Sequence, residues 1–276
     1  MKDELLNMSV LRRGGQKEVF LAKHPVEGNV VFKKIFPHSD STERTKREVR
    51  AVSLMHDLEF VPNILAHNCD EQDPEYLWLV EDYIDGQNLR DIITSGRNFS
   101  TAEIVIFLET MLQIAEVSES RNLVHRDIKP ENIIMDPAGN FWLLDFGIAR
   151  HLDLESITDS NNHFGLFTVG YASSEQFRNL KKMIDIRADL FSIGIVCHEM
   201  IKGENFYTTN VDNDIFKVIK KLENSSLPPL RINGDTQYLL STFLSLLGDH
   251  RRNRRPKTAR EARLILESLR NSLKLN

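Results

Sequence analysis

The stretch that decides the fold reads LVHRDIKPEN at residues 123–132 and is followed by FWLLDFG at residues 141–147. The first part joins an apolar lead to a dense run of charged and amide side chains. Such a run is costly to order unless its side chains have a function, because polar groups lose water when they are held in place. The second part is typical of a buried strand and ends in a carboxylate, Asp145, and a glycine. We therefore place the chemical centre of the chain in these two segments.

Both segments resemble motifs of the eukaryotic-type serine/threonine protein kinases, in the order and at the separation found in that family. HRDIKPEN resembles the catalytic loop, and DFG resembles the magnesium-binding turn. The resemblance implies that Asp127 orients the attacking hydroxyl and accepts its proton, and that Lys129 reaches the transferring phosphoryl group, as in Ser/Thr-directed members. It assigns Asn132 and Asp145 to Mg²⁺. The alternative is that Asp127 and Asp145 are ordinary loop caps.

The segment that begins at Leu11 resembles the glycine-rich loop of the family, with Leu11 and Val19 placed to enclose the adenine. Of the three glycines in G-x-G-x-x-G only the middle one, Gly14, is kept, and Arg12 and Lys17 replace the outer two. The added cations either narrow the approach of the phosphates or assist anion binding. Taken alone, the segment also fits a plain β-hairpin with a basic tip.

VVFK at 30–33 resembles the V-A-I-K strand, which implies that Lys33 reaches the α- and β-phosphates and that Glu48 is its ion-pair partner. Glu48 lies in the charged stretch 41–58, where apolar residues recur at helical spacing. This pattern predicts one amphipathic helix, whose position would switch activity. The alternative for Glu48 is a solvated helix charge.

The strand expected at 76–84 ends in the connection between the two halves of the chain. Glu81 falls where the family usually has an apolar residue that guards the rear of the adenine pocket. A carboxylate there must find a partner or contact water. A shift by one residue would make Val80 the guard instead. In either register, the backbone from Asp82 to Ile84 is expected to hydrogen-bond adenine.

TVGYASSEQ at 168–176 resembles the segment G-T-x-x-Y-x-A-P-E, with Ser174 where the family has proline. Small-molecule kinases of the related phosphotransferase class do not usually carry this segment, so it favours a protein substrate. The resemblance makes Glu175 a scaffold residue that pairs with Arg255. It makes Asp189 a second scaffold residue, which binds the backbone around the catalytic loop.

The stretch between Asp145 and Glu175 corresponds to the activation segment of the family. We favour Thr158 and Ser160 as phosphorylation sites there, with Arg126 as the cationic receiver. The alternative is that these hydroxyls are ordinary polar residues of a mobile loop.

The 276 residues are 41% hydrophobic and 27% charged, which is ample for a core, and the net charge is −5. This charge argues against a protein whose main task is to neutralise a phosphate backbone, so nucleic acid is not an expected partner. Cys69 and Cys197 lie far apart and predict neither disulfides nor a metal site. Without a signal peptide or a window of about 18 apolar residues, we expect a cytoplasmic chain with no membrane contact.

A run of cations near the C-terminus admits two interpretations. It is a docking surface for acidic protein or nucleic acid, or, as such runs more often are, a solvated loop and helix face. Its members are Arg251, Arg252, Arg254, Arg255, Lys257, Arg260 and Arg263.

The fold class expected from these patterns is α+β and bilobal, as one protein kinase domain over 1–276. A small β-rich N-lobe with one regulatory helix covers 1–84, and a larger helical C-lobe covers 85–276. Two strands are expected around a turn at Glu27–Asn29. Helices are expected to start at Ser100 or Thr101 and to lie near 187–202, 213–223, 236–247 and 258–272.

The function expected from the resemblance is ATP-dependent phosphorylation of serine and threonine hydroxyls on proteins, including the chain itself. ATP and Mg²⁺ are the expected cofactors, with Mn²⁺ as an alternative ion. The substrate proteins and the oligomeric state are left open. A pseudokinase or nucleotide-binding scaffold is the alternative, supported by the eroded glycine-rich loop, Glu81 and Ser174, and a small-molecule kinase is less favoured. The SSEQ segment resembles the bacterial S-P-E-Q form and suggests a bacterial or phage source.

Overall fold

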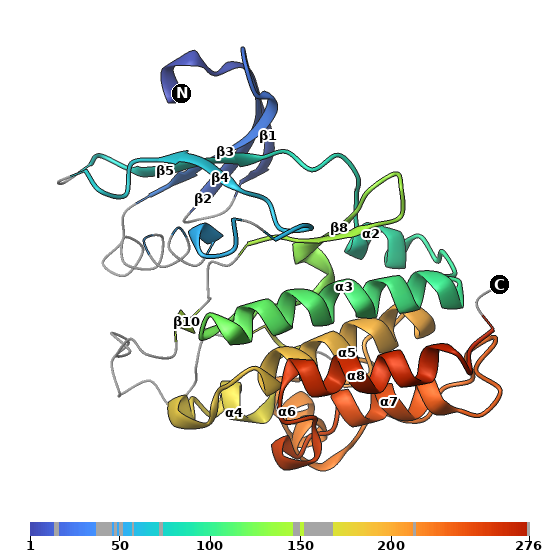
Figure 1. Cartoon of the computed structure of the whole chain (residues 1–276). Coiled ribbons are helices and arrows are strands. Elements are labelled where there is room, and N and C mark those ends of the chain that lie inside the picture. Colours follow the sequence, from blue (N-terminus) through green and yellow to red (C-terminus); the bar gives the residue numbers. More distant parts are fainter. Residues whose placement is uncertain are drawn as a thin grey trace.

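The computed structural model describes residues 1–13, 17–36, 46, 49, 52–56, 58–71, 74–145, 150–151, 168–211 and 214–274. The N-terminal part forms an antiparallel five-stranded sheet in the order β1-β2-β3-β5-β4, drawn at the top of Figure 1. Its elements are a 3-10 helix (Lys2–Glu4), β1 (Leu6–Arg13), β2 (Lys17–His24), β3 (Gly28–Ile35), β4 (Ile64–His67) and β5 (Leu77–Asp82).

The hairpin between β2 and β3 is present, but its turn lies earlier than predicted. Residues 25–27 form the turn, and Gly28 already pairs with His24 as the first residue of β3. The His24 ring explains the shift, because its Nδ1 accepts the N–H groups of Val26 (3.3 Å) and Glu27 (3.2 Å). Gly28 has a φ of 75°, in the left-handed region that glycine adopts without steric cost.

The two faces of the sheet are buried in different ways, because side chains alternate along each strand. One face packs Ile35, Leu77 and Leu79 against Val49, whose backbone is helical. The other face includes Phe32 and Val80 and is covered by the N-terminal residues. The helix predicted over 41–58 lies largely outside the described residues; of its described members, 46, 49, 52 and 53 are helical, whereas 54–56 form a turn and 58 is not helical, so the helix ends earlier than predicted.

The C-terminal part is helical and also contains two small sheets. Its helices are α2 (Leu89–Thr94), α3 (Thr101–Ser120), α4 (Ser174–Phe177), α5 (Arg187–Lys202), α6 (Ile215–Asn224), α7 (Leu239–Leu247) and α8 (Ala259–Arg270). The short elements are β6 (Gln87–Asn88), β7 (Leu123–Val124), β8 (Ile133–Met135), β9 (Phe141–Leu143), β10 (Arg150–His151) and the 3-10 helices Pro130–Asn132, Lys181–Met183 and Arg252–Arg254. The small sheets are β6-β8-β9 and β10-β7.

Helix α5 packs against α3 and α7, and α8 in turn packs against α3 and α7 (Figure 1). All residues of α5 from Ala188 to Met200 are buried, as expected of a helix enclosed by others. Helix α3 begins as predicted, because Ser100 and Glu103 form a capping box. No helix of the described chain has the length and apolarity needed to cross a membrane. The predicted α+β bilobal fold is thus confirmed.

His198 on α5 predicts a pH dependence of stability. Its ring is 3% exposed, packs against Phe206, and has no hydrogen-bond partner among the described residues. Burial, with a smaller contribution from Lys202, lowers the pKa of His198 to about 4. The unfolded chain therefore takes up a proton at higher pH than the folded chain, and stability falls as the pH drops below about 6.5.

We expect this histidine to account for a loss of ~2 kcal/mol in the free energy of unfolding between pH 7 and pH 5. Urea denaturation at both pH values, on wild type and His198→Leu, measures it. The variant should lose ~2 kcal/mol less than wild type. The exposed His56 gives the control His56→Leu, which should behave as wild type. Equal pH dependence in wild type and His198→Leu would contradict the prediction.

Candidate active site

The first turn of α5 holds the loop that follows β7 in place. Asp189 accepts the backbone N–H groups of His125 and Arg126, each at 2.8 Å. Burial raises the pKa of Asp189, whereas the two N–H donors favour its ionised form. Arg126 has a φ of 70°, a conformation that a bulky residue adopts only when the surroundings hold it. The scaffold contact expected of Asp189 is thus present, and it fixes the backbone next to Asp127.

Asp127 follows directly and is held by three side chains. Its Oδ2 lies 2.7 Å from Lys129 Nζ and accepts Asn132 Nδ2 at 3.1 Å, and its Oδ1 accepts the Thr168 hydroxyl at 2.5 Å. Lys129 Nζ also donates to Thr168 Oγ1 at 2.9 Å. These contacts orient the carboxylate, which is the geometric requirement for a group that positions a reacting hydroxyl and takes its proton.

Thr168 was not among the predicted site residues, although it opens the segment TVGYASSEQ. Its hydroxyl joins Asp127 and Lys129, which lie about forty positions earlier in the chain. The signal that could have found it is the place of Thr168 at the start of that segment. The contact connects the predicted catalytic loop to the segment that favours a protein substrate.

Asn132 and Asp145 are the predicted metal ligands, and both offer oxygen atoms. The Asn132 amide donates its N–H groups to the main-chain oxygen of Asp127 (2.9 Å) and to its carboxylate, which leaves Oδ1 as the remaining acceptor. Asp145 follows β9 with a φ of 60°. One carboxylate and one amide fit Mg²⁺, which is usually held by one or two protein oxygens together with substrate phosphates. The described residues contain no cluster of three or more His, Cys, Asp or Glu that could hold a metal ion.

Lys33 on β3 forms an ion pair that the sequence did not predict. Its Nζ lies 2.8 Å from Oε1 of Glu81, and the two side chains are only 6% and 12% exposed. Val31 is opposite Glu81 and Lys33 is opposite Leu79 in the β3–β5 register, so Glu81 and Lys33 share one face of the sheet. Val80 packs on the other face. Glu81, rather than Val80, therefore occupies the guarding position, and its carboxylate has found a partner.

This pair predicts that Glu81 competes with nucleotide for Lys33. Glu81→Gln keeps the shape but removes the charge, so we expect ATP to bind several-fold more tightly, because Lys33 is released to the phosphates and a repelling carboxylate is lost. Isothermal titration calorimetry measures the affinity. Glu27→Gln, in the exposed hairpin turn, is the control and should bind ATP as wild type does. Unchanged or weaker ATP binding by Glu81→Gln would contradict the competition.

The side chain of Asp82, at the end of β5, binds the residue that precedes β4. Its Oδ2 accepts both the backbone N–H and the Nδ2 group of Asn63 at 2.9 Å, and its own N–H donates to the Asn63 carbonyl. The N–H group of Asp82 is therefore already engaged, and the adenine contacts expected of the stretch from Asp82 to the half-buried Ile84 stay a prediction. Of the two residues expected to enclose adenine, Val19 pairs with Lys33 across β2 and β3, whereas Leu11 on β1 is 51% exposed.

Lys17, which replaces the last glycine of the loop, reaches the predicted metal ligand. Its Nζ lies 2.6 Å from Oδ2 of Asp145. The contact joins β2 to the segment after β9 across the expected nucleotide site. Other predicted site residues lie outside the described residues and stay predictions; these are Gly14, Glu48, Thr158 and Ser160.

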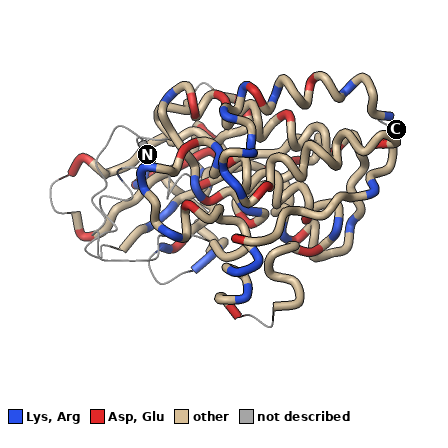
Figure 2. Tube along the Cα trace, turned by 90° about the horizontal axis from the view of Figure 1, so that it is seen from below, with Lys and Arg blue, Asp and Glu red and all other residues tan. Residues whose placement is uncertain are grey.

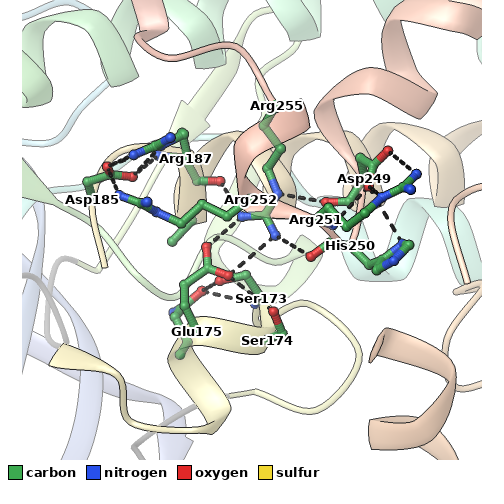
Figure 3. A network of polar contacts seen from close by, with 12 residues as sticks. Ser173, Ser174, Glu175, Asp185, Arg187, Asp249, His250, Arg251, Arg252 and Arg255 are labelled. Atoms are coloured by element: carbon green, nitrogen blue, oxygen red, sulfur yellow. Dashed lines mark hydrogen bonds and ion pairs between the residues drawn. The ribbon is translucent and has the colours of Figure 1, made fainter. Parts of the chain in front are cut away.

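The scaffold pair expected between Glu175 and Arg255 is present. Arg255 Nη1 lies 2.6 Å from Glu175 Oε1, and the two side chains are 0% and 3% exposed. As Figure 3 shows, Arg255 also donates to the carbonyl groups of Asp249 (2.7 Å), Arg187 (3.0 Å) and His250 (3.2 Å). The charge-assisted bonds connect α4, α5 and the loop before α8, and they fix the segment that carries Thr168.

Three of the other six cations in the run near the C-terminus form ion pairs within the fold. The ion pairs are Arg251–Asp249, Arg252–Asp185 and Arg263–Glu116, with N–O distances of 3.2, 2.5 and 2.6 Å. Figure 2 shows basic and acidic residues interspersed along the chain. The pairs favour the interpretation of the run as an ordinary charged face over that of a docking surface.

A network around Arg90 was also missed. Arg90 on α2 contacts Glu131 Oε1 at 2.7 Å and Glu199 Oε1 at 2.6 Å and donates to the Tyr171 hydroxyl, which donates to Glu199 Oε2 at 2.5 Å. Burial opposes the charge of Arg90, but its bonds to Glu199 and Glu131 outweigh burial and raise its pKa. The network ties the catalytic loop, the Thr168 segment and α5 together. No local signal reveals it, because its members come from four separate segments.

Comparisons with known proteins agree with this geometry. The family model for the protein kinase domain matches residues 7–263. Serine/threonine-protein kinase PrkC of Bacillus subtilis is 31% identical over 202 residues, which are 71% of this chain and 30% of the relative. A probable serine/threonine-protein kinase PknB of Bifidobacterium longum is 33% identical, over 72% of this chain and 30% of its own length. A probable serine/threonine-protein kinase of Clostridium acetobutylicum is 26% identical, over 94% and 38%. The chain spans about a third of the length of these curated relatives.

Proposed function

Because this chain belongs to the protein kinase family, we propose that it transfers the terminal phosphoryl group of ATP to serine and threonine hydroxyls of proteins, including its own. The observation that carries the proposal is the set of contacts among Asp127, Lys129 and Thr168. They present one carboxylate and one cation next to the segment that favours protein substrates. The carboxylate is needed to orient the substrate hydroxyl, and the cation is needed to stabilise the phosphoryl group.

In this proposal Asp127 orients the hydroxyl and takes its proton. Lys129 lies 2.7 Å from the carboxylate and stabilises the charge that develops on the phosphoryl group. Lys33 binds the α- and β-phosphates once it leaves Glu81. A divalent ion, Mg²⁺ or Mn²⁺, would be held by Asn132 and Asp145 and would neutralise phosphate charge.

The remaining roles are proposed on the same basis. The backbone of Asp82 and Ile84 hydrogen-bonds adenine, and Leu11, Gly14 and Val19 cover it. Glu48 is the second partner of Lys33 and couples the regulatory helix to activity. Residues 1–276 form one kinase domain, with the lobe boundary between residues 84 and 85.

Phosphorylation of Thr158 or Ser160 is proposed to be read by Arg126. We propose that the chain acts on protein substrates in the cytoplasm.

Incubation of the protein with labelled ATP, Mg²⁺ and a generic protein substrate tests the activity. We expect label on serine and threonine, and on the chain itself within 156–168. Label on tyrosine alone would contradict the Ser/Thr assignment. Nucleotide binding without any transfer would indicate a scaffold, and transfer to small molecules alone would indicate a small-molecule kinase.

A further inference from the structure

Lys17 stands on the active-site face of the large sheet. It pairs with Ile35, and Val19 pairs with Lys33, so alternation puts the side chains of Lys17, Val19 and Lys33 on one face. The neighbouring Glu18 points the other way and lies 3.6 Å from Arg13. Lys17 reaches down from this face to Asp145, at 2.6 Å, and the two side chains are 30% and 28% exposed. Lys17 therefore shares a sheet face with the cation that would bind phosphates and contacts the carboxylate that would bind metal.

This contact cannot persist unchanged when a divalent ion binds. Mg²⁺ lies about 2.0–2.1 Å from its oxygen ligands, and Lys17 already engages one oxygen of Asp145. Two cations on one carboxylate repel each other, and the repulsion is stronger in a partly buried site than in water. The added positive charge weakens the contact of Lys17 with Asp145 and favours transfer of the ammonium group to another anion. Its neighbour Glu18 is turned away, and phosphates bound between Lys33 and Asp145 would offer such an anion.

We propose that Lys17 is a phosphate-binding residue, which exchanges Asp145 for the terminal phosphate when nucleotide and metal enter. The inference rests on the proposed function and adds a phosphate ligand to it. The proposal explains why a lysine can stand in place of the glycine. Its side chain supplies a positive charge to the phosphates, whereas the glycine of the family offers only backbone N–H groups. Two consequences have opposite signs. Lys17 weakens metal binding in the absence of nucleotide, and it strengthens nucleotide binding when metal is present.

The test uses Lys17→Met, which removes the charge but keeps most of the side-chain length. Binding of Mn²⁺ without nucleotide is followed by electron paramagnetic resonance, and binding of ATP and of adenosine at saturating Mn²⁺ by calorimetry. We expect Mn²⁺ to bind about threefold to tenfold more tightly and ATP about tenfold more weakly, with adenosine affinity unchanged. The control is Lys23→Met, an exposed lysine of the same strand, which should leave all three affinities as in wild type. Lys17→Arg keeps the charge and should stay within about threefold of wild type throughout.

The opposite signs separate this role from a structural one. Damage to the loop would weaken metal, ATP and adenosine together, and that result overturns the proposal. So does a Mn²⁺ affinity of Lys17→Met equal to that of wild type. All three measurements are of binding, so they stand apart from phosphoryl transfer: absence of label transfer in wild type refutes the proposed activity and leaves the Lys17 result readable.

Discussion

An Asp127→Asn variant is expected to transfer phosphate about 10²- to 10⁴-fold more slowly than wild type while binding nucleotide equally well. Asparagine has nearly the shape of aspartate, but it takes up no proton and carries no charge. Its amide would present a donor to at least one of the groups that now donate to Asp127, which are Lys129, Asn132 and Thr168. The hydroxyl of the substrate would thus lose both its orientation and its proton acceptor. The nucleotide contacts proposed for Lys33 and Asp82 are made by other segments and should persist.

The measurement is the initial rate of label transfer to a protein substrate, with ATP affinity determined in parallel. Asp91→Asn on the exposed side of α2 is the matched control and should transfer at the wild-type rate. An Asp127→Asn rate within tenfold of wild type would remove Asp127 from its proposed role. A parallel loss of ATP affinity would instead show that the substitution disturbs the nucleotide site.

Much of the fold could be predicted because its signals are local. The capping box of Ser100 and Glu103 fixes the start of α3 within one turn of chain. The span predicted for α5, 187–202, agrees with the structure, because Gly203 ends the helix in a left-handed conformation. The hairpin turn was misplaced because its position depends on a contact of the His24 ring with backbone N–H groups, which composition does not reveal.

Residues of the candidate site could be predicted only where they belong to a motif that is identified by its order along the chain. Asp127, Lys129 and Asn132 are close in sequence, so their contacts follow from one loop. The pairs Lys33–Glu81 and Lys17–Asp145 join different strands or lobes, and they depend on which face of a strand each residue occupies. The sequence showed that a buried Glu81 needs a partner, but strand register decided which one. In the sequence, Lys17 and Glu81 depart from the motifs of the family and suggest that these motifs have been lost. In the structure, each of them contacts a residue of the expected nucleotide and metal site.

The other large effect is expected for Arg255, which among the described residues has the largest fully buried side chain. Its guanidinium pairs with Glu175 in a region where neither side chain meets water. Removing one partner of such a pair leaves an uncompensated charge in the interior, which is far more costly than losing a surface pair. Three backbone carbonyl groups would lose their donor as well.

Arg255→Met should therefore lower the free energy of unfolding by about 3–5 kcal/mol, measured by urea denaturation at pH 7. The double variant Arg255→Met with Glu175→Leu removes the stranded carboxylate and should regain part of that loss, although the carbonyl groups stay without their donor. Arg254→Met, one residue earlier and exposed, is the control and should unfold as wild type does. If the double variant is no more stable than Arg255→Met alone, the cost lies in the carbonyl contacts and packing of Arg255, and the buried charge is not its cause.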